Sequence, residues 1–371
     1  MVADFATTLL QHVSVGIHTT YDLKSLAHVI ENSQVSAIVC SREEVLKLLL
    51  AVELLNSSAS FVELRHLIVM QPNFMAQVRE ELLAKQYNIS ITTMAQVQTL
   101  PQTEQVSQLI VQQLDTFAVD EFHEAAKDHA PQSLFTILYT SGSTGQPKGV
   151  MISHDTFQQD ISHPIYIEPL VTVSYIPLSH STDRMRVYET ILNGGRVGFA
   201  NYHAGNWEEH ESGKKKSAEN FQDSFGSTNN VETLFNDVKI LQPTIFIAPP
   251  RIWNGLYELH NQWLAAAHGE ENAVKERVKS LLGNRIVHMA TGGAPSNPQV
   301  FQWVKTVFDK VPFDESYGCT ECGGIYMNGV IMHEVDAKIV PVADFETTYD
   351  SNKEAQRGEI IVKSNTVALG Y

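Results

Sequence analysis

The sequence predicts an α/β protein, built from layered α/β subdomains with a small β subdomain at its C-terminal end. Two observations support this fold class. From Val35 onward, short apolar runs alternate with longer amphipathic segments, which is the strand and helix alternation of a parallel sheet. Several apolar runs also end in glycine-rich turns. Because ligands of open α/β sheets gather at the carboxyl ends of the strands, we expect the functional residues just after these runs.

The first part of the chain contains two strand and helix pairs. Short runs rich in β-branched residues predict strands, and longer segments with apolar residues three and four apart predict helices. After a polar passage at residues 101–131, the run "SLFTILYT" predicts a strand that leads into a glycine-rich loop. The elements predicted here are strands at residues 35–40, 64–70 and 133–140, and helices at 42–55 and 72–87.

The second part of the chain continues the alternation and then changes character. Residues 202–230 are polar with little apolar periodicity, which predicts a long surface loop. Past Ile325, strand-like runs at 334–342 and 358–364 follow one another without a helix, so we expect a small β subdomain at 326–371 and a larger domain at 1–325. The remaining predicted elements are strands at 171–179, 196–200, 244–250 and 285–293, a helix at 182–192, and a long helical region at 251–282.

Composition narrows the class of protein. With 371 residues, 43% of them hydrophobic, the chain can bury a large core in two or three domains or subdomains. A formal net charge of -16 argues against a nucleic-acid partner, because phosphate backbones bind clustered Lys and Arg. The one basic run, residues 213–216, fits a solvated loop. Three cysteines suit a reducing compartment. We therefore expect an intracellular, cytoplasmic protein, with peripheral membrane attachment left open.

The stretch "LYTSGSTGQPKGVMISH" is the densest chemical signal in the sequence. Three interpretations compete: a tight structural loop, a Walker-type phosphate loop, or another phosphate cradle. A Walker loop needs glycine before its lysine and Ser or Thr after it, whereas Pro147 precedes Lys148 and Gly149 follows it. Glycines that let backbone amides converge, several hydroxyls and one lysine still suit a polyphosphate. The third interpretation is therefore favoured.

The glycine-rich stretch and four later segments resemble the sequence motifs of a known superfamily. "YTSGSTGQPKGV" resembles the phosphate-binding signature of the adenylate-forming superfamily, which includes acyl-CoA synthetases, luciferases and the adenylation domains of carboxylic acid reductases. Four further segments resemble its later motifs in the correct order: "IPLSH", "TGGAP", "DESYGCTECGG" and "RGEIIVKSNTVALGY". The resemblance covers residues 140–371 and implies the fold of the superfamily's large N-terminal domain. It also implies ATP-dependent activation of a carboxylic acid to an acyl-adenylate.

The resemblance assigns a role to each motif. Thr144 and its neighbours would hold the β- and γ-phosphates, Thr320 would meet the α-phosphate, and Glu321 with Thr144 would bind Mg²⁺. Tyr317 would pack on the adenine, with the backbone at 292–294 on its other face, and His180 would border the carboxylate pocket. The implied catalytic residues are Lys148, Thr320 and Glu321, and the implied nucleotide-binding residues are Thr140, Ser141, Gly142, Ser143, Thr144, Gly145, Gly149, Gly292, Gly293, Ala294, Glu315, Tyr317 and Gly318.

Two residue types in these motifs have other interpretations. Cys319 and Cys322 form a C-x-x-C pair, which alone could be a redox or zinc half-site. No second pair accompanies it, and the threonine and glutamate between the cysteines already account for the segment. A histidine after a strand is usually structural, so the role of His180 depends on the resemblance.

The resemblance also bears on the enzyme subtype and on how much of the family's large domain the chain contains. Residues 176–195 and 241–258 resemble both long-chain acyl-CoA synthetases and carboxylic acid reductases, so fatty acid, ATP and coenzyme A are the expected small-molecule partners. By resemblance the chain begins inside the large domain and ends before the superfamily's mobile C-terminal lid domain. We therefore expect a truncated large domain that alone binds ATP weakly at best and forms no thioester with coenzyme A. A noncatalytic nucleotide- or acyl-binding module, and the adenylation part of a carboxylic acid reductase, are the alternatives.

Overall fold

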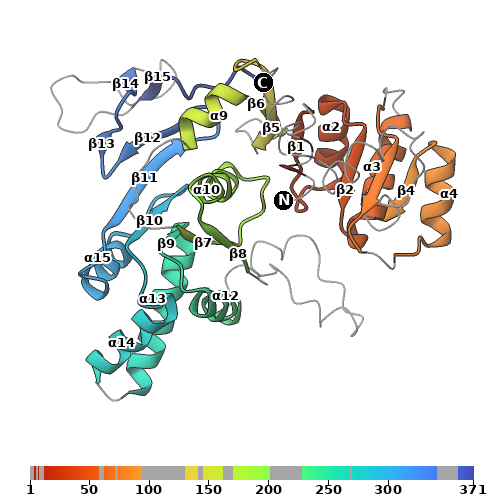
Figure 1. Ribbon diagram of the computed structural model, residues 1–371. Helices are drawn as coiled ribbons and strands as arrows, with labels where there is room; N and C mark the ends of the chain where they lie inside the picture. The colour runs from red at the N-terminus through yellow and green to blue at the C-terminus, as the bar shows by residue number, and fades with distance from the viewer. Residues whose placement is uncertain are drawn as a thin grey trace. The chain divides into compact units, whose positions relative to one another are not determined.

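The computed structural model describes residues 4, 5, 7, 12–57, 62–71, 74–93, 130–140, 145–161, 170–200, 228–267, 270–340 and 358–371. Four predicted site residues, 141–144, therefore lie outside the described residues. The chain forms two compact units (Figure 1). Unit 1 comprises Met1–Phe157, Leu178–Ser181 and Ala368–Tyr371, and unit 2 comprises Gln158–Pro177 and Thr182–Val367.

Unit 1 contains a parallel three-stranded sheet in the order β2-β3-β4. Helix α3 shows why these residues fold as they do, because Val45, Leu48, Leu49, Val52 and Leu55 are all buried and recur at helical spacing. They pack with buried side chains of the strands in one cluster. The elements are α2 (Leu23–Ser33), β2 (Ala37–Cys40), α3 (Val45–Ser57), β3 (His66–Val69), α4 (Val78–Gln86) and β4 (Ser90–Thr93).

Two details of this sheet differ from the sequence prediction. Helix α2 was not predicted; Asp22 caps it by accepting a hydrogen bond from the Ser25 amide at 2.7 Å. Helix α4 begins at Val78, so the predicted start at residue 72 is wrong. The Glu80 carboxylate accepts a hydrogen bond from the Gln77 amide at 2.6 Å, which satisfies a donor that helix geometry leaves open at this end.

The second sheet of unit 1 holds the glycine-rich loop. It has the order β1-β5-β6 and consists of β1 (Ser14–Gly16), β5 (Leu134–Thr140) and β6 (Lys148–Ser153). Strands β1 and β5 are parallel, whereas β5 and β6 are antiparallel with Thr140 opposite Lys148. The glycine-rich loop therefore connects two neighbouring strands. Helix α9 (His154–Ile161) follows β6 directly.

Unit 2 contains a two-stranded parallel sheet, β7 (Val171–Ser174) with β8 (Arg196–Phe199), and a five-stranded sheet in the order β13-β12-β11-β10-β9. Strands β9, β10 and β11 are parallel, and β11, β12 and β13 are antiparallel. The five strands are β9 (Ile245–Ala248), β10 (His288–Gly292), β11 (Phe313–Cys319), β12 (Gly323–Met327) and β13 (Val330–Ile331).

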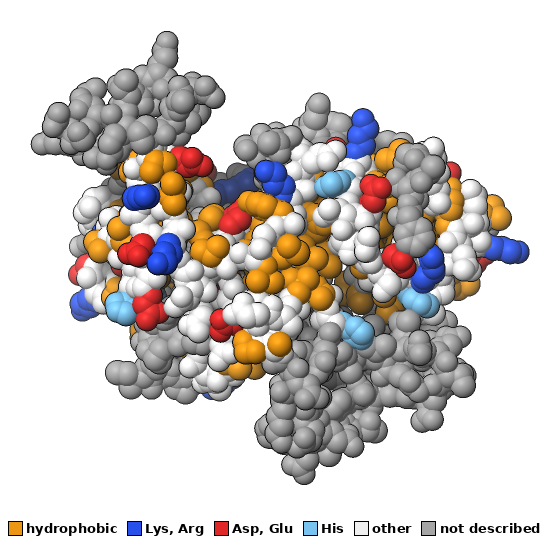
Figure 2. All heavy atoms as spheres, turned by 90° about the horizontal axis from the view of Figure 1, so that it is seen from above, with side chains coloured by type: hydrophobic (Ala, Val, Ile, Leu, Met, Phe, Trp, Pro, Cys, Tyr) orange, Lys and Arg blue, Asp and Glu red, His pale blue; other side chains and the backbone are white. Residues whose placement is uncertain are grey.

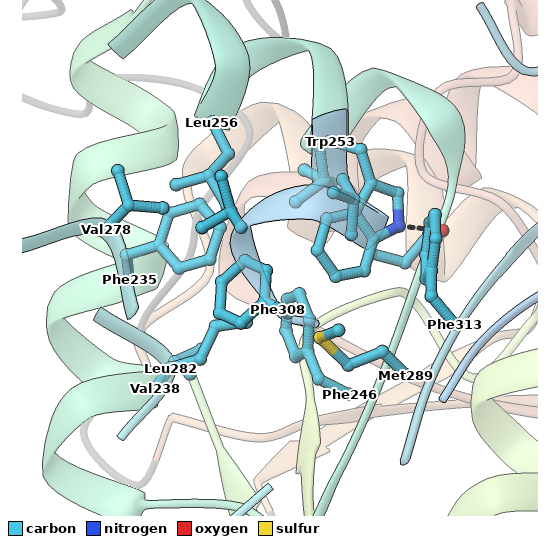
Figure 3. Close-up of a cluster of buried hydrophobic side chains, with 14 of the residues drawn as sticks. Phe235, Val238, Phe246, Trp253, Leu256, Val278, Leu282, Met289, Phe308 and Phe313 are labelled. Atoms are coloured by element: carbon cyan, nitrogen blue, oxygen red, sulfur yellow. Dashed lines mark hydrogen bonds between the residues drawn. The ribbon is translucent and has the colours of Figure 1, made fainter. Parts of the chain in front are cut away.

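The helices of unit 2 enclose its core. Trp253 is 1% exposed, and its indole nitrogen donates a hydrogen bond to the Ala248 carbonyl at 3.1 Å, which joins α13 to the end of β9 (Figure 3). Phe246 and Phe313 both pack edge-on against the same indole. Truncating such a residue typically costs about 3 to 5 kcal/mol. The helices are α10 (Ser181–Leu192), α12 (Thr228–Leu241), α13 (Pro250–Ala266), α14 (Glu271–Leu282) and α15 (Pro298–Val307).

Several predicted boundaries in unit 2 are corrected. The strand predicted at 171–179 ends at Ser174, and the region at 251–282 is two helices, because the described residues between α13 and α14 leave helical geometry. Residues 228–230, expected in the polar loop, begin α12; residues 202–227 lie outside the described residues. The expected domain boundary after Ile325 falls inside β12. The antiparallel hairpin of β14 (Asp336–Val340) and β15 (Glu359–Lys363) lies in the expected β segment.

The surface carries charges of both signs. On the face in Figure 2, basic and acidic side chains of the described residues are interspersed with hydrophobic ones, and no continuous basic area is seen there. Within the described residues, every helix is too short or too polar to span a bilayer.

Candidate active site

The described part of the glycine-rich loop is a tight hairpin end. A Cβ on Gly149 would lie 2.8 Å from Ile137 Cγ2 and 2.9 Å from the Tyr139 ring, so only glycine fits opposite Tyr139 without displacing these side chains. Gly145 has φ of 90°, a conformation that glycine adopts at no steric cost. The exposed Lys148 begins β6, and its Nζ lies 5.4 Å from the centre of the Tyr371 ring.

Side chains from α2 and its approach hold both ends of this loop. The Tyr139 carbonyl, one residue before the end of β5, accepts hydrogen bonds from His18 Nε2 at 3.1 Å and from the Tyr21 hydroxyl at 3.4 Å. On the other side of the loop, His28 Nε2 donates to the Pro147 carbonyl at 3.1 Å. The Tyr139 hydroxyl in turn donates to Asn32 Oδ1 at 2.5 Å. The loop therefore begins and ends near carbonyl groups that are fixed from α2 and the segment that leads into it.

His18 also connects the loop to His180. Because His18 Nε2 donates to the Tyr139 carbonyl, its Nδ1 is the acceptor for the Ser179 hydroxyl at 2.9 Å. The His18 and His180 rings lie 4.5 Å apart, centre to centre. Burial lowers the pKa of His18, although its hydrogen bond to the Tyr139 carbonyl acts in the opposite direction. Burial is also the main cause that lowers the pKa of His180, and electrostatic repulsion from His18 is the second. Both rings are therefore neutral at pH 7.

Sequence reasoning missed His18, and the reason is separation along the chain. Its partners Tyr139 and Ser179 are 121 and 161 residues away. The one available signal was position, because His18 follows the short strand β1 and polar residues after strands are candidates for a site.

The predicted adenine-binding residues lie together at the carboxyl edge of the parallel strands of unit 2. In the register of β10 and β11, Gly292 lies opposite Ser316, so residues 292–294 continue beside Tyr317. A Cβ on Gly292 would lie 2.4 Å from Ser316 Oγ, which makes glycine necessary for this close approach. Gly293 has φ of 80° and turns the chain away from the strand. Gly293 and Ala294 are both exposed, so their backbone is accessible to a ligand.

Tyr317 presents an open aromatic surface beside this turn. Its side chain is 52% exposed, and its ring lies 6.1 Å from that of Tyr326 on β12. The pairing of β11 with β12 shifts register between Tyr317 and Gly318. A Cβ on Gly318 would lie 2.2 Å from the Gly323 carbonyl oxygen. The strand can therefore bulge here only because residue 318 is glycine.

The base of β11 is fixed by a polar network. Asn328 accepts a hydrogen bond from the Glu315 amide at 2.8 Å and donates to Asp314 at 2.7 Å, and its own amide donates to the Glu315 carbonyl at 2.7 Å. His288 Nε2 lies 2.7 Å from Asp314 Oδ2. Although burial acts to raise it, hydrogen bonds from Asn328 and His288 hold the pKa of Asp314 below its usual value. These contacts act on the backbone that carries Glu315 and Tyr317.

Thr320 and Glu321 form the turn between β11 and β12. Both are half-buried. The Cys322 amide donates to the Cys319 carbonyl at 3.3 Å, which closes the turn, and the two sulfurs are 3.3 Å apart. The hydrogen bond that the Cys322 thiol donates lowers the pKa of Cys319. The same hydrogen bond, together with burial, raises the pKa of Cys322.

Glu321 fits the role of a magnesium ligand. Mg²⁺ in nucleotide sites is commonly held by one or two carboxylates together with substrate phosphates, and Glu321 supplies one carboxylate on an accessible turn. Among the described residues, no group of three or more His, Cys, Asp or Glu side chains could form a cage for a metal. A metal at Glu321 would therefore depend on phosphate oxygens for its other ligands. Thr144, the second predicted ligand, lies outside the described residues.

A hollow of about 580 Å³ in unit 2 is not this site. It is lined by residues before β9, β10 and β11, among them Gln242, Ile286 and Val311. It therefore lies at the amino edge of the parallel strands, whereas ligands of such sheets bind at the carboxyl edge.

The described site residues thus form two groups. Unit 1 contains Thr140, Gly145, Lys148, Gly149 and His180, together with His18. Unit 2 contains Gly292, Gly293, Ala294, Glu315, Tyr317, Gly318, Thr320 and Glu321. The unit 1 group collects residues that are far apart in sequence, whereas the unit 2 group comes from one segment of the chain, between Gly292 and Glu321. Ser141, Gly142, Ser143 and Thr144 are not described.

Comparison with curated proteins gives relatives of two kinds. The chain is 29% identical over 261 residues to a carboxylic acid reductase of Mycobacterium tuberculosis, a match that covers 66% of this chain and 20% of that protein. It is 22% identical over 412 aligned residues to fatty acyl-CoA synthetase A of Dictyostelium discoideum, which covers 100% of this chain and 53% of that protein. The chain thus spans between about a fifth and about half of the length of these relatives.

Comparison with solved structures and family profiles agrees with the fold. The A-PCP didomain of carboxylic acid reductase from Segniliparus rugosus, solved in complex with AMP, superposes with a TM-score of 0.70 at 21% identity, over 99% of this chain and 48% of that chain. The predicted α/β fold of an adenylation domain is therefore confirmed. The profile of the AMP-binding enzyme family matches residues 1–209 and 221–371. With nearly its whole length matched and the motifs in order, the chain belongs to the AMP-binding, adenylate-forming enzyme family.

Proposed function

We propose that this chain activates a carboxylic acid with ATP, forming an acyl-adenylate and pyrophosphate. The carboxylate oxygen attacks the α-phosphorus, and the bond to the bridging oxygen of pyrophosphate breaks. The observation that carries this proposal is the carboxyl edge of β10 and β11, where an exposed tyrosine lies beside an exposed glycine turn. A flat ring on one side and bare backbone on the other suit a planar base such as adenine.

The glycine-rich hairpin would bind the phosphates. Gly145 lets the backbone turn, Gly149 lets β6 pack closely against Tyr139, and Lys148 is exposed at the start of β6. A lysine held beside converging amides stabilises an anion and the charge that moves to pyrophosphate as it leaves. His18, Tyr21 and His28 fix the ends of the hairpin before the nucleotide arrives. This preorganisation reduces the cost of ordering the loop in the transition state.

Thr320 and Glu321 would act on the reacting phosphate. The Thr320 hydroxyl is a hydrogen-bond donor suited to an α-phosphate oxygen. Magnesium, when bound at Glu321, would neutralise phosphate charge and align the leaving pyrophosphate. Glu315 and Gly318 would set the position of this turn, since one is held by Asn328 and the other permits the bulge.

His180 would border the carboxylic acid. Its pKa is lowered, so the ring is neutral at pH 7, and a neutral imidazole donates one hydrogen bond without holding the acid in a strong ion pair. Such weak ground-state binding leaves the carboxylate nucleophilic. His18 holds the Ser179 hydroxyl next to it.

We propose two candidates for the carboxylic acid substrate and for the group that accepts the acyl chain. A long-chain fatty acid with coenzyme A as acceptor follows the resemblance to fatty acyl-CoA synthetase A, whose match extends over 100% of this chain. The adenylation step of a carboxylic acid reductase is the second candidate, favoured by the higher identity of 29% over a shorter region. Both share the same first half-reaction.

Acid-dependent exchange of pyrophosphate into ATP tests this half-reaction directly. We expect exchange with palmitate that falls about 100-fold in Lys148→Ala, as for loss of one preorganised charge. The matched control is Lys338→Ala, which removes an exposed strand lysine in β14 and should leave exchange unchanged. Glu321→Gln should raise the magnesium concentration needed for half-maximal exchange.

The outcomes of this test separate the proposals. Equal exchange in Lys148→Ala and in the parent would contradict the role of the hairpin. No exchange with any acid, despite saturable binding of AMP, would instead favour a noncatalytic binding module. Adding coenzyme A to an exchanging sample then distinguishes an acyl-CoA ligase, which releases AMP and acyl-CoA, from a domain that awaits another acceptor.

A further inference from the structure

The thiols of Cys319 and Cys322 are the one feature of the β11–β12 turn that adenylation does not use. Cys319 is exposed, whereas Cys322 is 6% exposed. Their sulfurs lie 3.3 Å apart, so an approach of about 1.2 Å would bring them to the length of a disulfide bond. The outer thiol can meet a small oxidant, and the inner thiol is already in place to react with it.

Metal binding explains this pair less well. Two thiolates are half of a tetrahedral zinc set. Among the described residues, no third ligand accompanies them in a metal-binding group. Cys40, in unit 1, is the contrasting case, because it is buried at 7% exposure and lies in a hydrophobic cluster without a second cysteine.

We propose that Cys319 and Cys322 are a reversible redox modification site, which takes a peroxide as oxidant and reshapes the turn that carries Thr320 and Glu321. The Cys319 sulfur attacks one peroxide oxygen, the O–O bond breaks, and water leaves with the thiol proton, giving a sulfenic acid. The Cys322 sulfur then attacks the Cys319 sulfur, and the hydroxyl leaves as a second water. Two thiols and one hydrogen peroxide thus give one disulfide and two waters, with two electrons passing to the peroxide.

The strain of closing the bond would fall on the residues between the cysteines. Cys322 is held from outside the turn, because its carbonyl accepts a hydrogen bond from the Thr366 hydroxyl at 2.7 Å. Cys319 is held in β11 by its pairing with Gly323. With the backbone fixed at both ends, the approach that rotation of the cysteine side chains does not supply would displace Thr320 and Glu321. This consequence rests on the proposed function of those two residues at the α-phosphate and the metal.

The chemical part is tested on the full chain, purified with reductant and then treated with hydrogen peroxide. After alkylation of the remaining thiols, peptide mass spectrometry should find a disulfide between Cys319 and Cys322 that dithiothreitol reverses, with Cys40 alkylated throughout. In Cys322→Ala, dimedone should trap a sulfenic acid at Cys319. If Cys322→Ala does not fold, the presence or absence of the Cys319–Cys322 disulfide in the oxidised parent still tests the proposal. Absence of the disulfide, or oxidation of Cys40 at an equal rate, would overturn the proposal.

The effect on the turn is tested by AMP affinity before and after oxidation. Oxidised parent should bind AMP about tenfold more weakly, the effect of losing one good polar contact, and reductant should restore binding. Cys319→Ser, which cannot close the bond, should keep its affinity in peroxide. A disulfide that leaves AMP affinity unchanged would overturn the switching role. If reduced parent does not bind AMP at all, the proposed function fails, whereas the disulfide map still decides the chemical claim.

Discussion

The glycine-rich hairpin of unit 1 and the β10–β11 edge of unit 2 hold their functional backbone by different means. The hairpin is fixed by side chains that reach it from α2 and its approach, 118 to 121 residues away in sequence. The β10–β11 edge is fixed by strand register and by glycines packed directly against neighbouring backbone. Side-chain supports can adjust to a small change, whereas backbone contacts cannot, so the two regions should respond differently to the same substitution.

The largest effect is expected for Gly318→Ala compared with Gly149→Ala. The new Cβ at 318 meets a carbonyl oxygen at 2.2 Å, whereas that at 149 meets side-chain atoms at 2.8 and 2.9 Å. We expect Gly318→Ala to lower the free energy of unfolding by about 3 kcal/mol or more, and Gly149→Ala by about 1 to 2 kcal/mol. Chemical denaturation measures both, and acid-dependent exchange should fall further in Gly318→Ala.

Gly329→Ala is the control for that comparison. Its φ of 78° strains an alanine, but no atom lies within 4 Å of the new Cβ, so about 1 kcal/mol is expected. If Gly149→Ala proves as damaging as Gly318→Ala, the distinction between adjustable and rigid support is wrong.

Removal of the His18 support should have an intermediate effect. His18→Ala loses hydrogen bonds to the Tyr139 carbonyl and to Ser179, each worth about 1 kcal/mol. We expect pyrophosphate exchange to slow about tenfold and the KM for ATP to rise. His18→Gln retains one donor and one acceptor and should recover part of the rate. An equal loss in both variants would mean that His18 contributes only packing.

Removal of Asn328 affects the other region. Asn328→Ala loses the side-chain hydrogen bonds to Asp314 and to the Glu315 amide, at an expected cost of about 1 to 3 kcal/mol of unfolding free energy. Because strand pairing still fixes the backbone, the rate of exchange should fall less than in His18→Ala. A larger loss of exchange in Asn328→Ala than in His18→Ala would reverse the comparison.

A final effect, confined to acidic pH, is expected at Asp183, which lies at the start of α10. Burial raises its pKa to about 6, although a hydrogen bond from Ser174 opposes the shift. Because the folded state holds this proton more tightly than the unfolded state, stability falls as pH rises from about 4 to 6, by up to about 3 kcal/mol. Asp183→Asn should flatten this part of the curve of unfolding free energy against pH. An unchanged slope would exclude Asp183 as its source.

Local pattern predicted much of the fold but not the supports of the site. The strand ending at Thr140 and the glycine turn after β10 could be predicted, because apolar runs followed by glycine are local signals. The antiparallel partner β6 was missed, since a glycine-rich loop does not reveal whether a helix or a strand follows. The position of His18 beside His180 was missed because it depends on folding two distant segments together.

The C-x-x-C pair shows a different limit. The sequence showed two cysteines around a threonine and a glutamate. Because the threonine and glutamate were assigned to nucleotide binding, the two thiols received no predicted role. Only the structure shows that one sulfur is exposed, the other buried, and both within 3.3 Å. The spacing of the two cysteines identified them as candidates, whereas the exposure of Cys319 and the distance between the sulfurs support a redox reaction.

The central claim is that the ends of β10 and β11 form an adenine platform, and calorimetric titration of the reduced full chain with AMP tests it most directly. We predict saturable binding at one site, weakened about tenfold in Tyr317→Ala by loss of the aromatic contact. Phe199→Ala, which removes a 59% exposed aromatic at the end of β8, should bind as the parent does. Absence of AMP binding by the parent, or equal weakening in Tyr317→Ala and Phe199→Ala, would contradict the claim.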